Sequence, residues 1–352
     1  MKKTDDIRRD VPSNKVTIKD ITDFYAFYYC HTWDDFTTAN KDGKFKGLLD
    51  LIKKPIGKFS ITCSHLFENI TKSIETTGWV DIENEYYNFL RSFLSESKYN
   101  NPKQLNDELD FIRTKLIEYF IKVQDTCINE GIINKEIEKK ISEPINKEDL
   151  SIETTEYFKG IRKVAPFKSK KEIEEYNFTT TDHPSPEKIL ILDFNYTKTA
   201  DLYFPKEQNI TINHIHGDLE HPESVIFGYG DELDRDYKDL ARLNDNELLR
   251  NIKSIKYLES SNYRNVLSFI GWDKFQIYIM GHSCGNSDRT LMNTLFEHKN
   301  CASIKPFYYQ SKNNEDNYLE MVQNISRNFT DMKLMRDRVV NKKFCEPLPQ
   351  KE

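Results

Sequence analysis

The sequence Ile189-Leu190-Ile191-Leu192-Asp193-Phe194-Asn195-Tyr196-Thr197 decides the fold class, because an apolar run of strand type stops abruptly at polar residues. Such a run is typical of a buried strand in an α/β sheet. The pattern recurs where Ile210-Thr211-Ile212 leads into His214-Ile215-His216-Gly217, and where Gln276-Ile277-Tyr278-Ile279-Met280 leads into Gly281-His282-Ser283-Cys284-Gly285-Asn286-Ser287-Asp288. Ligands of such sheets lie at the carboxyl ends of the strands. We therefore expect these three polar strings to share one pocket.

Length, charge and cysteine content exclude several classes of protein. The chain has 352 residues, which is enough for one large domain or two ordinary ones. A net charge of −6 and a pI near 5.9 give no general attraction to nucleic acid or acidic membranes. No apolar stretch reaches the ~20 residues of a membrane span, and the charged N-terminus has no signal-peptide core. The six scattered cysteines form no C-x-x-C pair, so we expect a cytoplasmic, reduced protein without a metal site.

Patterning divides the chain into four expected parts. Residues 1–78 form an N-terminal segment, and residues 79–186 form a helical insertion and a linker, where apolar residues recur at spacings of three and four. Residues 187–340 hold the strands and form the α/β core. Residues 341–352, with two prolines and several charges, form a flexible tail. A further strand is expected at Ile304–Tyr309 and a helix at Tyr318–Ile325.

The first two polar strings contain candidate catalytic residues. Asn195 follows a strand, where its amide can fix a ribose hydroxyl or a water, or can instead cap the next turn. His214 and His216 alternate along an extended segment, so their side chains should point to opposite faces. One of them can face a pocket as a general base, and Gly217 lets the backbone approach a ligand. The alternation argues against a metal site, and His216 is expected at a strand end outside the core.

The third string has two interpretations. Gly281-His282-Ser283-Cys284-Gly285 matches the nucleophile elbow of α/β serine hydrolases. In those enzymes the acid and then the histidine follow the serine, whereas His298 is the one histidine after Ser283 and lies too close in sequence to return as the base. The other interpretation is a small-residue turn whose amides and Ser283 hydroxyl hold phosphate or ribose at a helix N-terminus. We favour the turn and keep the hydrolase as an alternative.

Four motifs in this order resemble the AbiH family of bacteriophage abortive-infection proteins. They are Gly78-Trp79-Val80-Asp81-Ile82-Glu83, Phe194-Asn195-Tyr196-Thr197, His214-Ile215-His216-Gly217 followed by Ile226-Phe227-Gly228, and Gly281-His282-Ser283 with Asp288. The resemblance covers about residues 79–325. It implies membership of the SIR2-like group, whose Rossmann-type parallel sheet binds NAD, here with a helical insertion.

The resemblance also implies roles for single residues. Asn195 would lie beside the nicotinamide ribose, His216 would act as the base, and Asp288 would orient the turn that holds the adenosine half. The NAD-binding residues implied are Asn195, Tyr196, Thr197, Gly217, Gly281, His282, Ser283 and Asp288. The function implied is antiphage defence by NAD hydrolysis, which would make the chain an NAD glycohydrolase. Formation of a homo-oligomer is left open.

One feature departs from the family pattern. Its members open with a strand and a Gly-Asn-Gly-Phe-Asp turn for the dinucleotide phosphates, whereas the first glycine here is Gly43 and no G-x-G-x-x-G occurs. The chain either starts downstream of that turn or has lost it, so we expect weak NAD hydrolysis from the isolated polypeptide. Two alternatives to an NADase stay open: a Ser283 hydrolase, and a nucleotide-sensing or partner-binding defence subunit without turnover.

Overall fold

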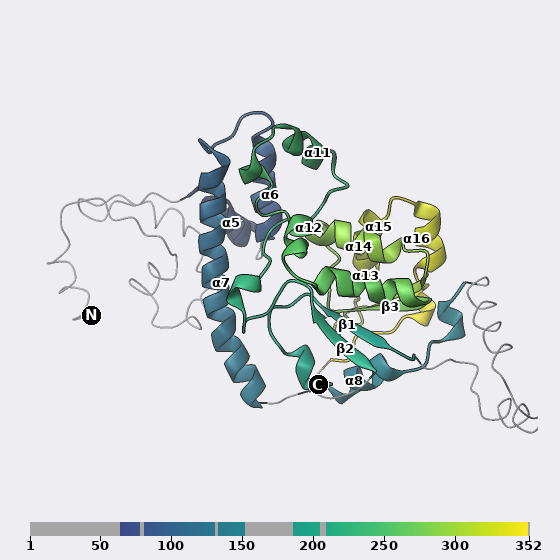
Figure 1. The fold of residues 1–352 in the computed structure, drawn as a ribbon. Coiled ribbons are helices and arrows are strands. Elements are labelled where there is room, and N and C mark those ends of the chain that lie inside the picture. Colours follow the sequence, from purple (N-terminus) through teal and green to yellow (C-terminus); the bar gives the residue numbers. More distant parts are fainter. Residues whose placement is uncertain (1–63, 78–80, 131–132, 152–185, 205–208, 351–352) are drawn as a thin grey trace, which may run out of the picture. The chain divides into compact units, whose positions relative to one another are not determined.

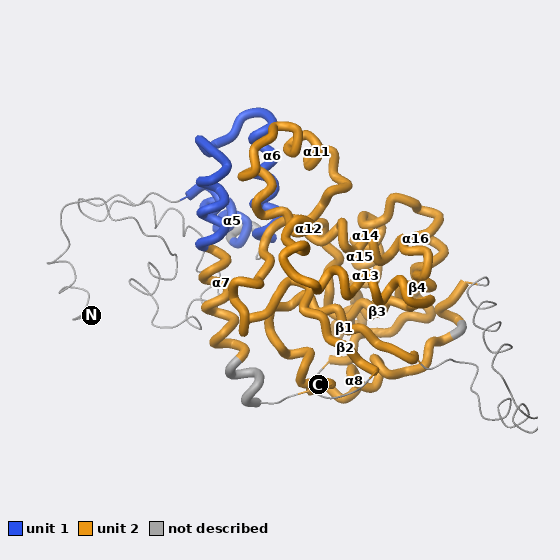
Figure 2. Tube along the Cα trace, viewed as in Figure 1, with its two compact units in different colours: residues 1–111 blue, residues 112–352 orange. Residues whose placement is uncertain are grey.

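The computed structural model describes residues 64–77, 81–130, 133–151, 186–204 and 209–350 (Figure 1). The chain divides into two compact units, residues 1–111 and 112–352, which Figure 2 colours separately. Most of the predicted N-terminal segment, Trp79 of the first family motif and most of the predicted linker lie outside the described residues. The four-part division expected from the sequence stays a prediction.

The first unit is helical in its described part. It contains α5 (His65–Thr77), α6 (Ile82–Ser92) and the first turns of α7 (Pro102–Glu130). Helix α6 begins after Asp81, whose side chain accepts a hydrogen bond from the N–H of Asn84 at 3.0 Å, as N-cap residues do. The apolar repeat becomes the buried face of α6, formed by Tyr86, Tyr87, Phe89 and Leu90. The helical character predicted for this stretch is confirmed in α6 and α7.

Besides the rest of α7, the second unit contains four strands and seven helices among the residues that are described. The strands are β1 (Ile189–Asp193), β2 (Ile210–His214), β3 (Phe275–Met280) and β4 (Cys301–Phe307). The helices are α8 (Lys135–Ser142), α11 (Arg235–Arg242), α12 (Lys253–Lys256), α13 (Asn262–Trp272), α14 (Arg289–Phe296), α15 (Tyr318–Arg327) and α16 (Met332–Arg338). Short 3₁₀ turns are η1 (Lys147–Asp149), η2 (Ala200–Leu202), η3 (Pro222–Ser224), η4 (Asn246–Leu248), η5 (Tyr257–Glu259), η6 (Asn286–Asp288) and η7 (Lys342–Phe344).

The strands form two parallel pairs. Strand β1 pairs with β2 from Ile189 opposite Ile210 to Asp193 opposite His214, and β3 pairs with β4. Parallel neighbours need a crossover, and α14 lies on the crossover from β3 to β4. The predicted α/β class is therefore confirmed. A single Rossmann-type sheet stays a prediction, because the described strands form two separate two-stranded sheets.

One hydrophobic core joins the two strand pairs. Ile279 of β3 and Leu192 of β1 pack in the same cluster, together with apolar side chains of α13, α14 and α15. Every residue of β4 is buried, whereas β1 and β3 are mostly half-buried. The near-continuous apolar composition of these strands is typical of strands that are covered on both faces.

Residues 341–350, which composition placed in a flexible tail, run beside the end of β4. The N–H of Leu348 donates to the carbonyl of Tyr308 at 2.8 Å, and the N–H of Tyr308 donates to the carbonyl of Glu346 at 3.4 Å. Lys140 in α8 forms an ion pair with Glu346 at 2.8 Å. Backbone pairing of this kind does not depend on apolar side chains, so composition carries no signal of it.

Candidate functional site

A buried group of charged side chains lies where the polar strings after β2 and β3 meet. The Oδ1 atom of Asp288 lies 3.1 Å from Nε2 of His216 and accepts a hydrogen bond from Nζ of Lys253 at 2.9 Å. Nε2 of His282 faces Oδ2 of the same carboxylate at 3.8 Å. The exposed fractions are 7% for Asp288, 3% for His216 and 1% for Lys253. Such burial strengthens the interactions between these charges.

The carboxylate of Asp288 is held ionised. Burial alone would raise its pKa, but the Lys253 ammonium and then the His216 ring hold the pKa of Asp288 well below its ordinary value. A buried charge is tolerated when it is paired and hydrogen-bonded. Asp288 is therefore a fixed carboxylate whose Oδ1 atom faces both Lys253 and His216.

Close backbone packing places Lys253 at this carboxylate. The N–H of Tyr229 donates to the carbonyl of Asn251 at 3.1 Å, and the N–H of Lys253 donates to the carbonyl of Tyr229 at 2.9 Å. A Cβ at Gly228 would lie 2.0 Å from the Asn251 oxygen, and one at Gly230 would lie 2.9 Å from a backbone oxygen of η6. Only glycine permits this approach, so the Ile226-Phe227-Gly228 motif serves to position Lys253.

His216 lies just beyond β2, and Gly217 turns the chain away from it. Gly217 has a φ of +81°, and a Cβ there would lie 2.2 Å from the Ser224 carbonyl oxygen. The carbonyl of His216 accepts a hydrogen bond from the N–H of Ile226 at 2.8 Å. The expectation that His216 lies outside the core is wrong, because neighbouring segments cover this strand end and leave the residue 3% exposed.

Aromatic rings enclose this histidine. The ring of Phe194 meets His216 edge to face, with centroids 5.4 Å apart, and lies 4.1 Å from the ring of His282. Tyr257 stacks parallel to His216 at 6.1 Å, and its hydroxyl lies 3.2 Å from Nε2. Tyr263 stacks against Tyr257 at 5.3 Å. These rings cover most of the imidazole and leave His216 3% exposed.

The first polar string contributes unequally to this cluster. Asn195 is exposed, and its backbone N–H and side-chain Nδ2 donate to Oδ1 of Asp193 at 2.9 and 3.1 Å. The ring of Tyr196 lies 6.4 Å from His216, whereas the hydroxyl of Thr197 bonds to Thr199 at 2.9 Å. The structure thus brings Phe194 and Tyr196 to His216, while the hydrogen bonds of Asn195 and Thr197 go to neighbours in sequence. Asp193 accepts both bonds and so closes this turn, whereas neither bond makes Asn195 the cap of a following turn.

The turn after β3 has its strained backbone at Cys284. Gly281 has a φ of +73° and Cys284 a φ of +53°, a conformation that costs energy for a residue other than glycine. The N–H of Cys284 donates to Nδ1 of His282 at 3.0 Å, which leaves Nε2 of that ring toward Asp288. Burial raises the pKa of the Cys284 thiol to about 12. This thiol is therefore protonated at neutral pH and is not a nucleophile.

The geometry does not favour the serine-hydrolase alternative. Ser283 is exposed, and its hydroxyl forms no hydrogen bond with any histidine in the described part of the chain. His298 packs against Phe275, the first residue of β3, with ring centroids 5.9 Å apart. Ser283 follows the other end of that strand. The strained turn position is also Cys284 rather than Ser283.

His214 lies in a second charged group. Its Nε2 is 2.9 Å from Oδ2 of Asp201, and its Nδ1 is 3.4 Å from Oδ2 of Asp193 without the alignment of a hydrogen bond. The carboxylate of Asp193, followed by that of Asp201, raises the pKa of His214 in spite of its burial. As the alternation predicts, His214 and His216 meet different carboxylates.

Sequence reasoning missed Lys253 and Tyr257. A lysine is expected in solvent, and nothing in the spacing around Lys253 marks it as buried. Its partner Asp288 lies 35 residues further along the chain. The one available signal was Gly228-Tyr229-Gly230, since paired glycines can mark a close approach of two backbones.

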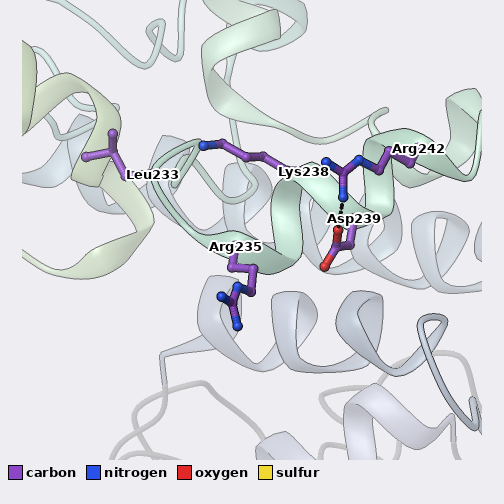
Figure 3. Close-up of a pocket in the computed structure, with 5 residues that line it drawn as sticks. All are labelled: Leu233, Arg235, Lys238, Asp239 and Arg242. Atoms are coloured by element: carbon purple, nitrogen blue, oxygen red, sulfur yellow. Dashed lines mark hydrogen bonds and ion pairs between the residues drawn. The ribbon is translucent and has the colours of Figure 1, made fainter.

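A separate hollow of about 500 Å³ lies at α11 (Figure 3). Its lining residues are Leu233, Arg235, Lys238, Asp239 and Arg242. Arg242 donates to Asp239 at 2.7 Å, which the dashed line in Figure 3 marks. This hollow contains no residue of the Asp288 group and none of the predicted site residues, so we place the candidate site at Asp288.

Neither a cluster of metal-ligating side chains nor a membrane-spanning helix occurs among the described residues. Among the described side chains, no group of three or more His, Cys, Asp or Glu residues could hold a metal ion. No helix in the described ranges is both long and apolar enough to cross a membrane.

Comparison with known proteins identifies a family. The family model described as "Bacteriophage abortive infection AbiH" matches residues 19–310. No curated protein and no solved structure matches the chain. The matched span includes the three polar strings and both residues that sequence reasoning missed.

Proposed function

The chain belongs to the AbiH family of bacteriophage abortive-infection proteins, and within the defence role that this family implies we propose that it binds and hydrolyses NAD. The observation that carries the proposal is the buried contact between His216 and Asp288, with Lys253 on the same carboxylate. A histidine oriented by a buried carboxylate suits general-base chemistry. We place the reaction in the cytoplasm.

The proposed reaction breaks the glycosidic bond between nicotinamide and C1′ of the ribose. Nicotinamide leaves with the bonding electron pair, the oxygen of a water bonds to C1′, and a proton of that water passes to His216 and then to solvent. Nδ1 is the accepting atom, because Nε2 contacts Asp288 and Tyr257, and no hydrogen bond reaches Nδ1 from the described residues. The contact between Nε2 and Asp288 keeps the ring in position while Nδ1 takes this proton.

We propose that neighbouring side chains make the remaining contacts with NAD. Phe194 and Tyr196 offer ring faces to the planar nicotinamide. Asn195 would fix the ribose or the attacking water with its side-chain oxygen, because its Nδ2 already donates to Asp193. The turn from Gly281 through His282 to Ser283 would hold the adenosine half, and Thr197 and Gly217 would also contribute to NAD binding. Lys253 is engaged by Asp288, so other groups must meet the diphosphate, which agrees with the weak hydrolysis that we expect from the isolated chain.

The test measures NAD directly. Bacteria that express the chain are infected with phage, and NAD, nicotinamide and ADP-ribose are quantified together with phage yield. We expect NAD to fall and both products to rise with the wild-type chain and not with His216→Gln. Asp239→Asn, which removes one partner of an exposed ion pair on α11, is the matched control and should behave like the wild type.

Two results would replace the proposal. Protection from phage at constant NAD would favour a nucleotide-sensing or partner-binding subunit. Labelling of Ser283 by a fluorophosphonate probe at constant NAD would favour the hydrolase. Size-exclusion chromatography of the same protein would show whether it self-associates.

A further inference from the structure

We infer that Lys253 is a positioning residue for His216: its ammonium neutralises Asp288, so that His216 stays a neutral imidazole able to accept a proton. The catalytic meaning of this inference rests on the proposed function. Its structural content, the protonation state of one ring, can be measured without any substrate.

The inference starts from a shared oxygen atom. Nζ of Lys253 and Nε2 of His216 face the same Oδ1 of Asp288, at 2.9 and 3.1 Å. Two positive partners would compete for this one oxygen, and lysine is the group that holds its proton at neutral pH. With the charge of Asp288 already balanced, His216 needs only to donate its Nε2–H. That hydrogen bond leaves the lone pair on Nδ1.

Removing Lys253 would leave the charge of Asp288 beside His216 without its other partner. A carboxylate within about 4–6 Å raises the pKa of a histidine by about 1–3 units when nothing else balances it. Without the ammonium, Asp288 would hold His216 as an imidazolium through neutral pH. An imidazolium has no lone pair and cannot act as a base.

The other groups around the carboxylate do not replace the lysine. The hydroxyl of Tyr257 is neutral at physiological pH, and the Phe194 ring carries no charge. His282 lies farther away, at 3.8 Å from Oδ2, and its Nδ1 already accepts the N–H of Cys284. Its side chain is also 21% exposed, so solvent weakens its attraction to Asp288. Among these neighbours, Lys253 is thus the charged group that balances the negative charge of Asp288 near neutral pH.

Close packing of two backbone segments fixes the position of Lys253. The Gly228–Gly230 segment runs beside Lys253, and a Cβ at Gly230 would lie 3.1 Å from Cβ of Lys253. The lysine stem is therefore confined where it leaves the backbone, and its ammonium meets Asp288 as a point charge. Arginine, with its planar and longer head group, is not an equivalent replacement here.

Histidine NMR on the full chain tests the inference. The chain is labelled with ¹⁵N-histidine, and the signal of His216 among the eight histidines is assigned by its loss in His216→Gln. In the wild type at about pH 8 we expect a neutral ring that carries its proton on Nε2 and none on Nδ1. In Lys253→Met we expect the pKa of His216 to rise by about one unit or more.

A matched control separates this effect from the loss of any buried lysine. Lys305 pairs with Asp149 at 3.1 Å and is also buried, with 7% of its side chain exposed. Lys305→Met therefore removes a comparable ion pair elsewhere and should leave the titration of His216 unchanged. If Lys253→Met does not fold, Asp288→Asn is compared with the double variant Lys253→Met/Asp288→Asn, and the pKa of His216 should be lower when the lysine is present.

The result that overturns the inference can come from the wild type alone. A wild-type His216 that stays an imidazolium up to about pH 9, or a titration that is identical with and without Lys253 in folded variants, would show that the lysine does not set its state. NAD hydrolysis is read separately. If the NMR result holds and NAD is not consumed, the proposed function fails while the role of Lys253 stands. If the NMR result holds and NAD is consumed, the acid limb of the pH–rate profile should shift to higher pH in Lys253→Met. It should shift by as much as the pKa of His216 rises.

Discussion

Nε2 of His216 lies 3.1 Å from Oδ1 of Asp288, although the two residues come from turns that follow different strands. His216 lies just beyond the end of β2, and Asp288 is the last residue of η6, which follows β3. Turns at the carboxyl ends of parallel strands can carry reactive groups because the strands beneath them are rigid. The contact joins the two strand pairs at the edge where we place the candidate site.

Asp288→Asn should destabilise the folded chain by about 3–5 kcal/mol, because the buried ammonium of Lys253 then has no counter-charge. Urea unfolding of purified protein measures the change. Asp239→Asn is the control, since the ion pair of Asp239 with Arg242 is exposed (40% and 77% of the side chains), and its effect should stay within about 0.5 kcal/mol. Equal effects of the two variants would show that the burial of Asp288 carries no energetic consequence.

His216→Ala should abolish NAD loss and protection from phage, because a positioned base contributes about 10²–10⁴-fold to the rate. Because the residue is buried beside Asp288, the alanine variant should also lose stability, so His216→Gln serves as the milder variant. His214→Ala should reduce activity less, since its ring meets Asp193 and Asp201 instead. Wild-type activity in folded His216→Gln would remove His216 from the mechanism.

Ser283→Ala should lower activity by about tenfold to a hundredfold, through the loss of one or two hydrogen bonds of about 0.5–1.5 kcal/mol each. The hydroxyl is exposed and has no histidine partner in the described part of the chain, so a fluorophosphonate probe should not label it. The measurements are the rate of NAD loss and mass spectrometry of the probe-treated chain. Complete loss of activity together with labelled Ser283 would establish the hydrolase instead.

Three glycine-to-alanine variants should change the stability of the folded chain by different amounts, two of them lowering it and one raising it. Gly217→Ala should lower the free energy of unfolding by about 2–5 kcal/mol. The positive φ strains the backbone of an alanine, and its Cβ would also overlap with the Ser224 carbonyl oxygen at 2.2 Å. Gly281→Ala, with a positive φ and open space around the Cβ, should cost only about 1–2 kcal/mol. Gly271→Ala in α13 also meets open space and should stabilise by about 0.5–1 kcal/mol. Thermal unfolding measures all three, and a Gly217→Ala effect no larger than that of Gly281→Ala would contradict the close approach.

Stability should depend on pH through His214. Asp193 and then Asp201 raise the pKa of His214 in the folded chain, so folding favours its protonated form. This contribution is complete below the unfolded pKa of about 6.5 and is lost as the pH rises through the higher folded pKa. His214→Asn should therefore cost more stability at about pH 6 than at about pH 9. Urea titrations at both values measure it, and equal losses would exclude a protonated His214 in the folded chain.

Much of the fold follows from local patterns in the sequence. The apolar runs predicted β1, β2 and β3, the run at Ile304–Tyr309 predicted β4, and the stretch from Tyr318 to Ile325 became α15. These patterns work because the period of apolar residues is a local property of the chain. The end of the chain beside β4 was not predicted, because its pairing uses backbone groups that every residue carries.

The sequence by itself determined the α/β class, the helices of residues 82–130, the family and the polar strings that contain His216, His282 and Asp288. Only the tertiary structure decided which of these residues meet, and that Lys253 and Tyr257 join them. The physical reason is that burial of a charge depends on partners far away in sequence. A lysine is stable at 1% exposure only because Asp288, 35 residues later, lies 2.9 Å from its nitrogen, and no local pattern records that contact.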